Sequence, residues 1–182
     1  MSEIVKPIAL FRERLLDLKG EYIGAKTAEL LSDSIVEFCI TNELTTVACG
    51  AGIEWLLPDL LVKLPGVVDV SKEANPETRK LMCRDASAGL TRADALLAES
   101  GTVVLASKFP GDRLVSTIPP VHLVVAFDVP VYRNFTEFIR TADHEPTYTF
   151  ISGPSRTADI EKILILGAHG PVRVVVWGQD TV

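Results

Sequence analysis

The densest group of residues that could bind or transform a ligand lies between Ile151 and Pro171. Gly153-Pro154 forces a turn after an apolar segment, and the glycines around His169 form a second turn. Two tight turns around a polar cluster, placed between strand-like segments, are typical of ligand pockets at strand ends in α/β proteins. The alternative is a pair of capped surface turns. The polar side chains between the turns are Ser155, Arg156, Thr157, Asp159 and Glu161.

Arg156 is the strongest candidate for an anion clamp in this stretch. A guanidinium presents a rigid fork of donors that suits a carboxylate or a phosphate. The hydroxyls of Ser155 and Thr157 and the backbone N–H groups of the Gly153 turn could add donors. In the alternative interpretation, Arg156 pairs with a carboxylate of the same stretch and only stabilises the turn.

Four side chains could transfer protons. His122 and His169 are candidates because an unperturbed imidazole titrates near neutral pH; the alternatives are a hydrogen-bonded strand residue and a turn residue. Asp159 and Glu99 are candidate general bases. Ser100, Gly101 and Thr102 follow Glu99 in a hairpin-like corner between two apolar strands and are candidate ligand contacts, as His169 is. No ligand spacing supports a metal site.

A second candidate site is the turn Gly50-Ala51-Gly52. It follows a short β-prone segment, 45–49, and precedes a helical segment, 53–63. Backbone N–H groups between a strand and a helix can bind an anion, so Gly50 and Gly52 are candidate ligand contacts. The alternative is that the glycines serve only the geometry of the turn.

Apolar periodicity and turn residues predict alternating strands and helices, and hence an α/β fold with a mostly parallel sheet flanked by helices. A single domain over 1–182 is expected. An amphipathic helix within residues 1–20 packs on that domain or, alternatively, forms an arm in a homodimer. Residues 91–94 are expected to form a polar turn. The other predicted helices are 26–41, 53–63, 75–88 and 135–142, and the predicted strands are 45–49, 67–70, 95–98, 103–106, 122–127, 148–151 and 172–177.

Composition narrows the class of protein. The 182 residues are 47% hydrophobic, with a mean hydropathy of +0.26, which favours a compact core over disorder. A net charge of −6 and a pI near 5.1 argue against a nucleic-acid partner. No apolar segment approaches the ~20 residues of a membrane span, and no secretory signal is expected. Cys39, Cys49 and Cys83 form no Cys-x-x-Cys pair, which indicates neither an iron–sulfur cluster nor zinc in this chain and fits a cytoplasmic protein.

Three segments together resemble the LUD-domain proteins, the lactate utilisation protein C family. They are Ala98–Thr102, Pro119–His122 and the stretch from Ser152 to Pro171, in the family's order and over about the C-terminal half. The resemblance implies a fold like that of ribose-5-phosphate isomerase and the CoA transferases. It also implies a role beside iron–sulfur proteins in oxidising L-lactate to pyruvate, with the clusters on those partners and no cofactor in this chain.

Three functions follow from this resemblance. The main expectation is an accessory or substrate-handling subunit that binds a small anionic metabolite or a phosphate-bearing ligand. The second is an acyl or CoA transferase or a sugar-phosphate isomerase, because Glu99-Ser100-Gly101 is similar to the Glu-Asn-Gly of CoA transferases, with Ser100 in place of asparagine. The third is a non-catalytic assembly module for iron–sulfur partners.

Overall fold

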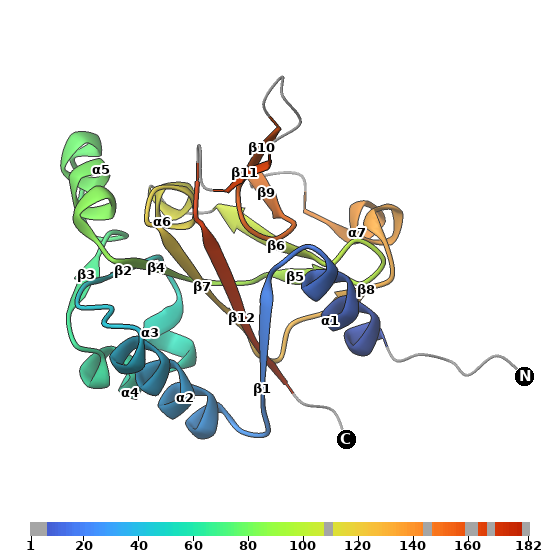
Figure 1. Cartoon of the computed structure of the whole chain (residues 1–182), viewed down its shortest axis with the longest axis horizontal. Coiled ribbons are helices and arrows are strands. Elements are labelled where there is room, and N and C mark those ends of the chain that lie inside the picture. The colour runs from blue at the N-terminus through green and yellow to red at the C-terminus, as the bar shows by residue number, and fades with distance from the viewer. Residues whose placement is uncertain (1–6, 108–110, 144–146, 159–163, 167–169, 180–182) are drawn as a thin grey trace, which may run out of the picture.

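The computed structural model describes residues 7–107, 111–143, 147–158, 164–166 and 170–179. At its centre is a six-stranded sheet in which every pair of neighbours is parallel (Figure 1). In spatial order its strands are β1 (Glu21–Ala25), β12 (Arg173–Gln179), β7 (Val121–Ala126), β4 (Ala88–Arg92), β2 (Val47–Cys49) and β3 (Val67–Asp69). This sheet confirms the predicted α/β class.

One face of the sheet is covered by α2 (Ala28–Thr41), α3 (Ile53–Leu56) and α4 (Pro58–Lys63). Trp177 of β12 is fully buried in this layer, which shows how completely the helices exclude water. The expectation of one helix over 53–63 is wrong, because the helix breaks at Leu57, where ψ is 70°. Pro58 causes the break, since it has no N–H to donate and disfavours helical backbone in the preceding residue.

The opposite face carries a second sheet and three helices (Figure 1). The second sheet has the order β8 (Val131–Tyr132), β5 (Ala95–Leu97), β6 (Thr102–Ser107) and β9 (Thr147–Ile151). The helices are α1 (Pro7–Asp17), α5 (Pro76–Asp85) and α6 (Asp112–Thr117). α7 (Phe135–Thr141) packs on the second sheet through Phe138, and β10 (Arg156–Ala158) pairs with β11 (Leu164–Leu166).

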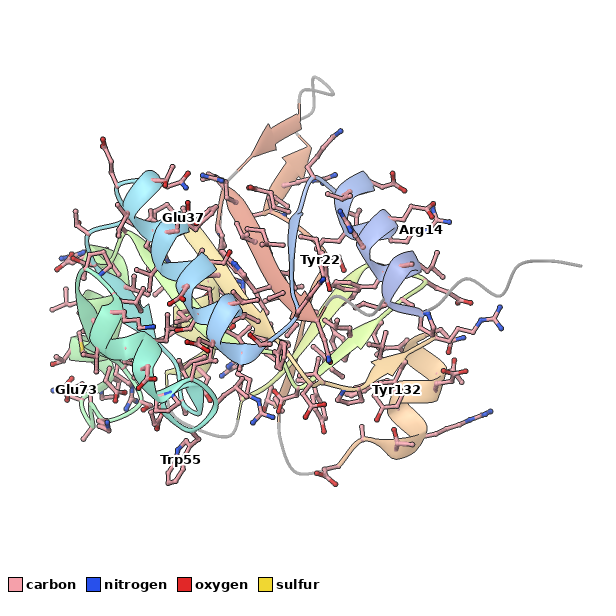
Figure 2. All side chains as sticks on the ribbon, turned by 90° about the horizontal axis from the view of Figure 1, so that it is seen from below. Arg14, Tyr22, Glu37, Trp55, Glu73 and Tyr132 are labelled. Carbon is pink, nitrogen blue, oxygen red and sulfur yellow. The ribbon has the colours of Figure 1, made fainter. Side chains whose placement is uncertain are left out.

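The first helix packs on its own domain. Phe11 and Leu15 are fully buried against apolar residues of the central sheet. Figure 2 shows Tyr22 of β1 beside α1, and its ring meets Phe11 edge-on at 6.3 Å between centroids. The observed helix therefore buries Phe11 and Leu15 within this chain.

Two parts of the sequence prediction fail near β4. Residues 91–94 were expected to form a polar turn, but Thr91 and Arg92 complete β4, and Thr91 is buried. The helix α6 was not predicted, although it lies directly on β4: a Cβ at Gly89 would collide with the Val115 carbonyl oxygen. Among the helices in the described ranges, none combines the length and apolar character needed to cross a membrane.

Candidate functional site

A small pocket lies at the carboxyl ends of β2 and β4. Its volume is about 130 Å³, and it is closed on one side by β6 and by the first residue of α6. We call it the carboxyl-edge pocket. Parallel sheets present ligands at this edge, because strand ends and the loops after them converge there. Its lining residues are Gly50, Ala51, Gly52, Thr91, Arg92, Asp94, Leu105, Ala106 and Asp112.

The glycine turn of this pocket already has carboxylate partners for its backbone. The Ala51 N–H donates to Asp112 Oδ1 at 3.2 Å, and the Gly52 N–H donates to Glu54 Oε2 at 3.1 Å. The Gly50 N–H donates to a β4 carbonyl. The two predicted contact glycines therefore lie in the pocket wall, but their N–H groups bind the chain's own acceptors.

Arg92 is the one cationic side chain among the described residues that line the pocket, which also include the carboxylates of Asp94 and Asp112. It is the last residue of β4 and is exposed, and within the described part of the chain no hydrogen bond or ion pair engages its guanidinium. Asp94 lines the same pocket, and its Oδ2 accepts the Ala106 N–H at 2.7 Å. An unpaired guanidinium can bind a carboxylate, and a nearby carboxylate can accept a hydroxyl hydrogen.

Below the pocket, Thr91 contacts the buried imidazole of His122. Thr91 Oγ1 lies 2.8 Å from His122 Nε2, while His122 Nδ1 has no hydrogen-bond partner in the described part of the chain. His122 is fully buried in β7, between β4 and β12. Burial lowers the pKa of His122 to about 3, because a charged imidazole cannot be solvated there. The imidazole of His122, the candidate proton shuttle, is thus neutral, and Thr91 lies between it and the pocket.

The Glu99–Thr102 and Ser152–Pro154 segments meet at the carboxyl end of α1. We call residues 99–102 and 152–154 the α1-facing turns. Thr102 Oγ1 lies 2.8 Å from Ser100 Oγ and 2.7 Å from Ser152 Oγ, so three hydroxyls form one chain. The structure therefore brings together two of the segments that the sequence singled out.

Both glycines of these turns lie against the backbone at the carboxyl end of α1 or directly after it. Gly101 has φ of +58°, and a Cβ there would stand 2.6 Å from the Leu15 nitrogen. Gly153 has φ of +81°, and a Cβ there would stand 2.7 Å from the Leu18 carbonyl oxygen. Only glycine allows both the positive φ and this close approach.

Glu99 is exposed and paired with the loop that precedes α7. Its Oε1 accepts a hydrogen bond from Arg133 Nε at 2.8 Å, and its backbone N–H donates to the Arg133 carbonyl at 2.9 Å. The structure thus places Glu99 at the surface in an ion pair, apart from the residues that line the carboxyl-edge pocket.

The remaining predicted contacts lie toward the amino ends of the strands. The Ser155 N–H donates to the Pro171 carbonyl at 2.9 Å, and the Val172 N–H donates to the Pro120 carbonyl at 2.8 Å. Arg156 begins β10 and is exposed. Thr157 follows it in β10, paired in register with Ile165. Asp159 and His169 lie outside the described residues.

Sequence reasoning missed the charged residues of the pocket. Arg92, Asp94 and Asp112 were not singled out, because 91–94 was interpreted as a turn and α6 was not predicted. The available signal was a polar group directly after the buried residues Ala88 to Leu90, which is where a parallel strand delivers side chains to its carboxyl edge.

A larger hollow of about 360 Å³ lies beside α1 and is lined by Ile8, Arg12, Leu16 and Tyr22, among others. Its charged groups, Arg12 and Glu13, are exposed on the helix surface. None of the predicted site residues in the described part of the chain lines it. The carboxyl-edge pocket is therefore the stronger candidate, although it is smaller.

Fold and pocket together define an α/β protein with a small ligand-sized hollow at the carboxyl edge of a parallel sheet. The family model of the LUD domain matches residues 8–177. The chain therefore belongs to the LUD domain family, which confirms the resemblance of the sequence segments.

Relatives named Lactate utilization protein C are similar to parts of this chain. The protein of Exiguobacterium sp. is 38% identical over 109 residues, which cover 56% of this chain and 47% of that protein. The protein of Anoxybacillus flavithermus is 38% identical over 91 residues, which cover 48% of this chain and 41% of that protein. The match thus spans less than half the length of each relative.

The fold has a counterpart among solved structures. A DUF162 family protein from Deinococcus radiodurans matches with a TM-score of 0.73 at 23% identity, covering 99% of this chain and 100% of that one. At this identity the likeness supports the arrangement of helices and strands.

Proposed function

We propose that this chain is a substrate-handling component of L-lactate utilisation and binds L-lactate in the carboxyl-edge pocket. The observation that carries the proposal is that an unengaged guanidinium, Arg92, and a carboxylate, Asp94, line the same small pocket of the described chain. A 2-hydroxy acid presents the complementary pair: a carboxylate for the arginine and a hydroxyl hydrogen for the aspartate.

The size of the pocket supports a small ligand. Pockets for drug-sized ligands measure roughly 300–1,000 Å³, whereas this one measures about 130 Å³. A metabolite of a few heavy atoms suits that space better than a nucleotide or a CoA ester. The names of the similar proteins, Lactate utilization protein C, support lactate among small carboxylates.

The three cysteines are buried and have no cluster-ligand spacing. Cys39, Cys49 and Cys83 lie far apart in the sequence and form no Cys-x-x-Cys pair. In keeping with the family resemblance, we assign the iron–sulfur chemistry of lactate oxidation to partner proteins.

The acyl-transfer alternative has less support. A nucleophilic glutamate needs a pocket for the acyl substrate beside it. Glu99 instead lies at the surface with Arg133.

Calorimetric titration of the full chain with L-lactate tests the proposal. Arg92→Ala should weaken binding at least about tenfold, because a charge-assisted hydrogen bond contributes ~1.5–3 kcal/mol. Arg156→Ala is the matched control, since it removes another exposed and unpaired arginine of the described chain, and it should bind as the wild type. Pyruvate, which lacks the hydroxyl hydrogen, should bind more weakly than L-lactate.

The opposite pattern, with binding lost only in Arg156→Ala, would move the site to the β10 hairpin. Absence of L-lactate binding by the wild type would contradict the proposal.

A further inference from the structure

The hydrogen bond between Thr91 and His122 can run in either direction. A threonine hydroxyl carries one hydrogen and accepts others, and a neutral imidazole carries its hydrogen on one of two nitrogens. Thr91 can donate to Nε2, which places the ring hydrogen on Nδ1. Alternatively, Nε2–H donates to Thr91 Oγ1, and the hydroxyl hydrogen is then available to another acceptor.

The surroundings of the two groups distinguish these directions. His122 is fully buried, and its Nδ1 has no partner among the described residues. If Nδ1 carried the hydrogen, a donor would be buried without an acceptor. A buried, unpaired N–H is rare and costs more than an under-used lone pair. With the hydrogen on Nε2, the ring donor has an acceptor in Thr91 Oγ1, and the Thr91 hydroxyl hydrogen can turn toward the pocket that Thr91 lines.

We infer that His122 is a positioning residue. Its Nε2–H donates to Thr91 Oγ1 and directs the Thr91 hydroxyl hydrogen into the carboxyl-edge pocket, where it donates to the carboxylate of the bound 2-hydroxy acid. The ligand part of this inference rests on the proposed function, while the direction of the hydrogen bond does not.

The fold keeps the imidazole in one place. His122 stands in register with Gly89 of β4 on one side and Val174 of β12 on the other, so the ring belongs to the interior of the sheet. Thr91 is on the neighbouring strand, two residues beyond Gly89, and is itself only 4% exposed. Two side chains fixed on adjacent strands can hold a hydroxyl hydrogen in one direction without help from solvent.

Nitrogen-15 NMR tests the direction of the bond. Long-range proton–nitrogen correlation on the labelled full chain reports which ring nitrogen carries the hydrogen. We expect a neutral ring at pH 7 with the hydrogen on Nε2. A hydrogen on Nδ1, or a charged ring, would overturn the inference. His122→Gln identifies the signals by their loss. If that variant does not fold, the double variant His144→Gln/His169→Gln leaves His122 as the sole histidine.

Calorimetry with L-lactate tests the contact to the ligand. Thr91→Val removes the hydroxyl at nearly constant shape and should weaken binding about tenfold. Thr91→Ser keeps the hydroxyl and should bind as the wild type. Equal binding by Thr91→Val and wild type would overturn the contact. If the wild type itself does not bind L-lactate, the proposed function fails, while the NMR result still decides the direction of the bond.

Discussion

The carboxyl-edge pocket and the α1-facing turns contain the same kinds of residues but use them differently. Each has two glycines and at least one threonine. In the turns, the hydroxyls bond to one another, and the glycines touch the backbone at the end of α1. In the pocket, a Cβ added at Gly52 would meet no described atom within 4 Å, and Arg92 has no partner among the described residues.

This difference distinguishes a turn that serves packing from a turn that can bind a ligand. A polar turn whose groups satisfy one another has little left with which to recognise a ligand. A pocket with an unengaged cation and a buried hydroxyl still has interactions to offer. Glycines in the sequence indicate a turn in both cases, and only the residues packed around each turn show which role it has.

The largest expected effect is a loss of stability caused by a substitution in the α1-facing turns. Gly101→Ala should lower the free energy of unfolding by about 3 kcal/mol or more, because the new Cβ meets the helix backbone and the positive φ is itself unfavourable. Urea denaturation of the full chain measures the loss.

Gly52→Ala is the matched control, since Gly52 also has positive φ, +87°, but open space around it. Gly52→Ala should lower the free energy of unfolding by about 1 kcal/mol, because only the unfavourable positive φ contributes and no new contact is made. Equal losses in the two variants would show that contact with α1 contributes nothing.

Much of the fold could be predicted because local signals agree with tertiary packing. Asn75 and Asn134 each cap a helix, accepting backbone N–H bonds as their positions predict. The first helix buries Phe11 and Leu15, two of the apolar residues whose helical spacing predicted it. β1 was missed because Glu21–Ala25 is short and only partly apolar, and α6 because its Asp-Arg-Leu-Val-Ser-Thr sequence has weak helix-forming residues. Packing on Gly89 stabilises what propensity alone does not.

The site was harder to predict than the fold. Gly50 and Gly52 were singled out from a strand–turn pattern, and they do line a pocket. Asp112 reaches the same pocket although it lies 61 positions beyond Ala51, whose N–H it accepts. Contact between segments so far apart in the sequence depends on the order of the strands in the sheet. The periodicity of apolar residues does not reveal that order. The low pKa of His122 could not be predicted from the sequence either, because it results from the burial of the side chain in the folded chain.

A second prediction concerns the stability of the buried pair below the pocket. The pKa of His122 is about 3 in the folded chain and 6.5 for an exposed imidazole, so the unfolded chain binds more protons between these values. Stability should therefore fall as pH falls through this window, by about 2 kcal/mol from pH 7 to pH 5. Carboxylates also titrate there, so the informative quantity is the difference in slope between wild type and His122→Gln. Parallel slopes would mean that the pKa of His122 is the same in the folded and the unfolded chain, and would contradict the prediction.

The smallest effect is expected at Glu99, on the surface of the α1-facing turns. Its carboxylate is 45% exposed and pairs with an Arg133 side chain that is 72% exposed, an arrangement that water and salt screen strongly. Glu99→Gln keeps the shape and a hydrogen-bond acceptor for Arg133. The variant should therefore match the wild type in urea midpoint and in L-lactate affinity. A clear loss of lactate binding in Glu99→Gln, with the midpoint unchanged, would instead assign chemistry to the turns and reverse the distinction between the two regions.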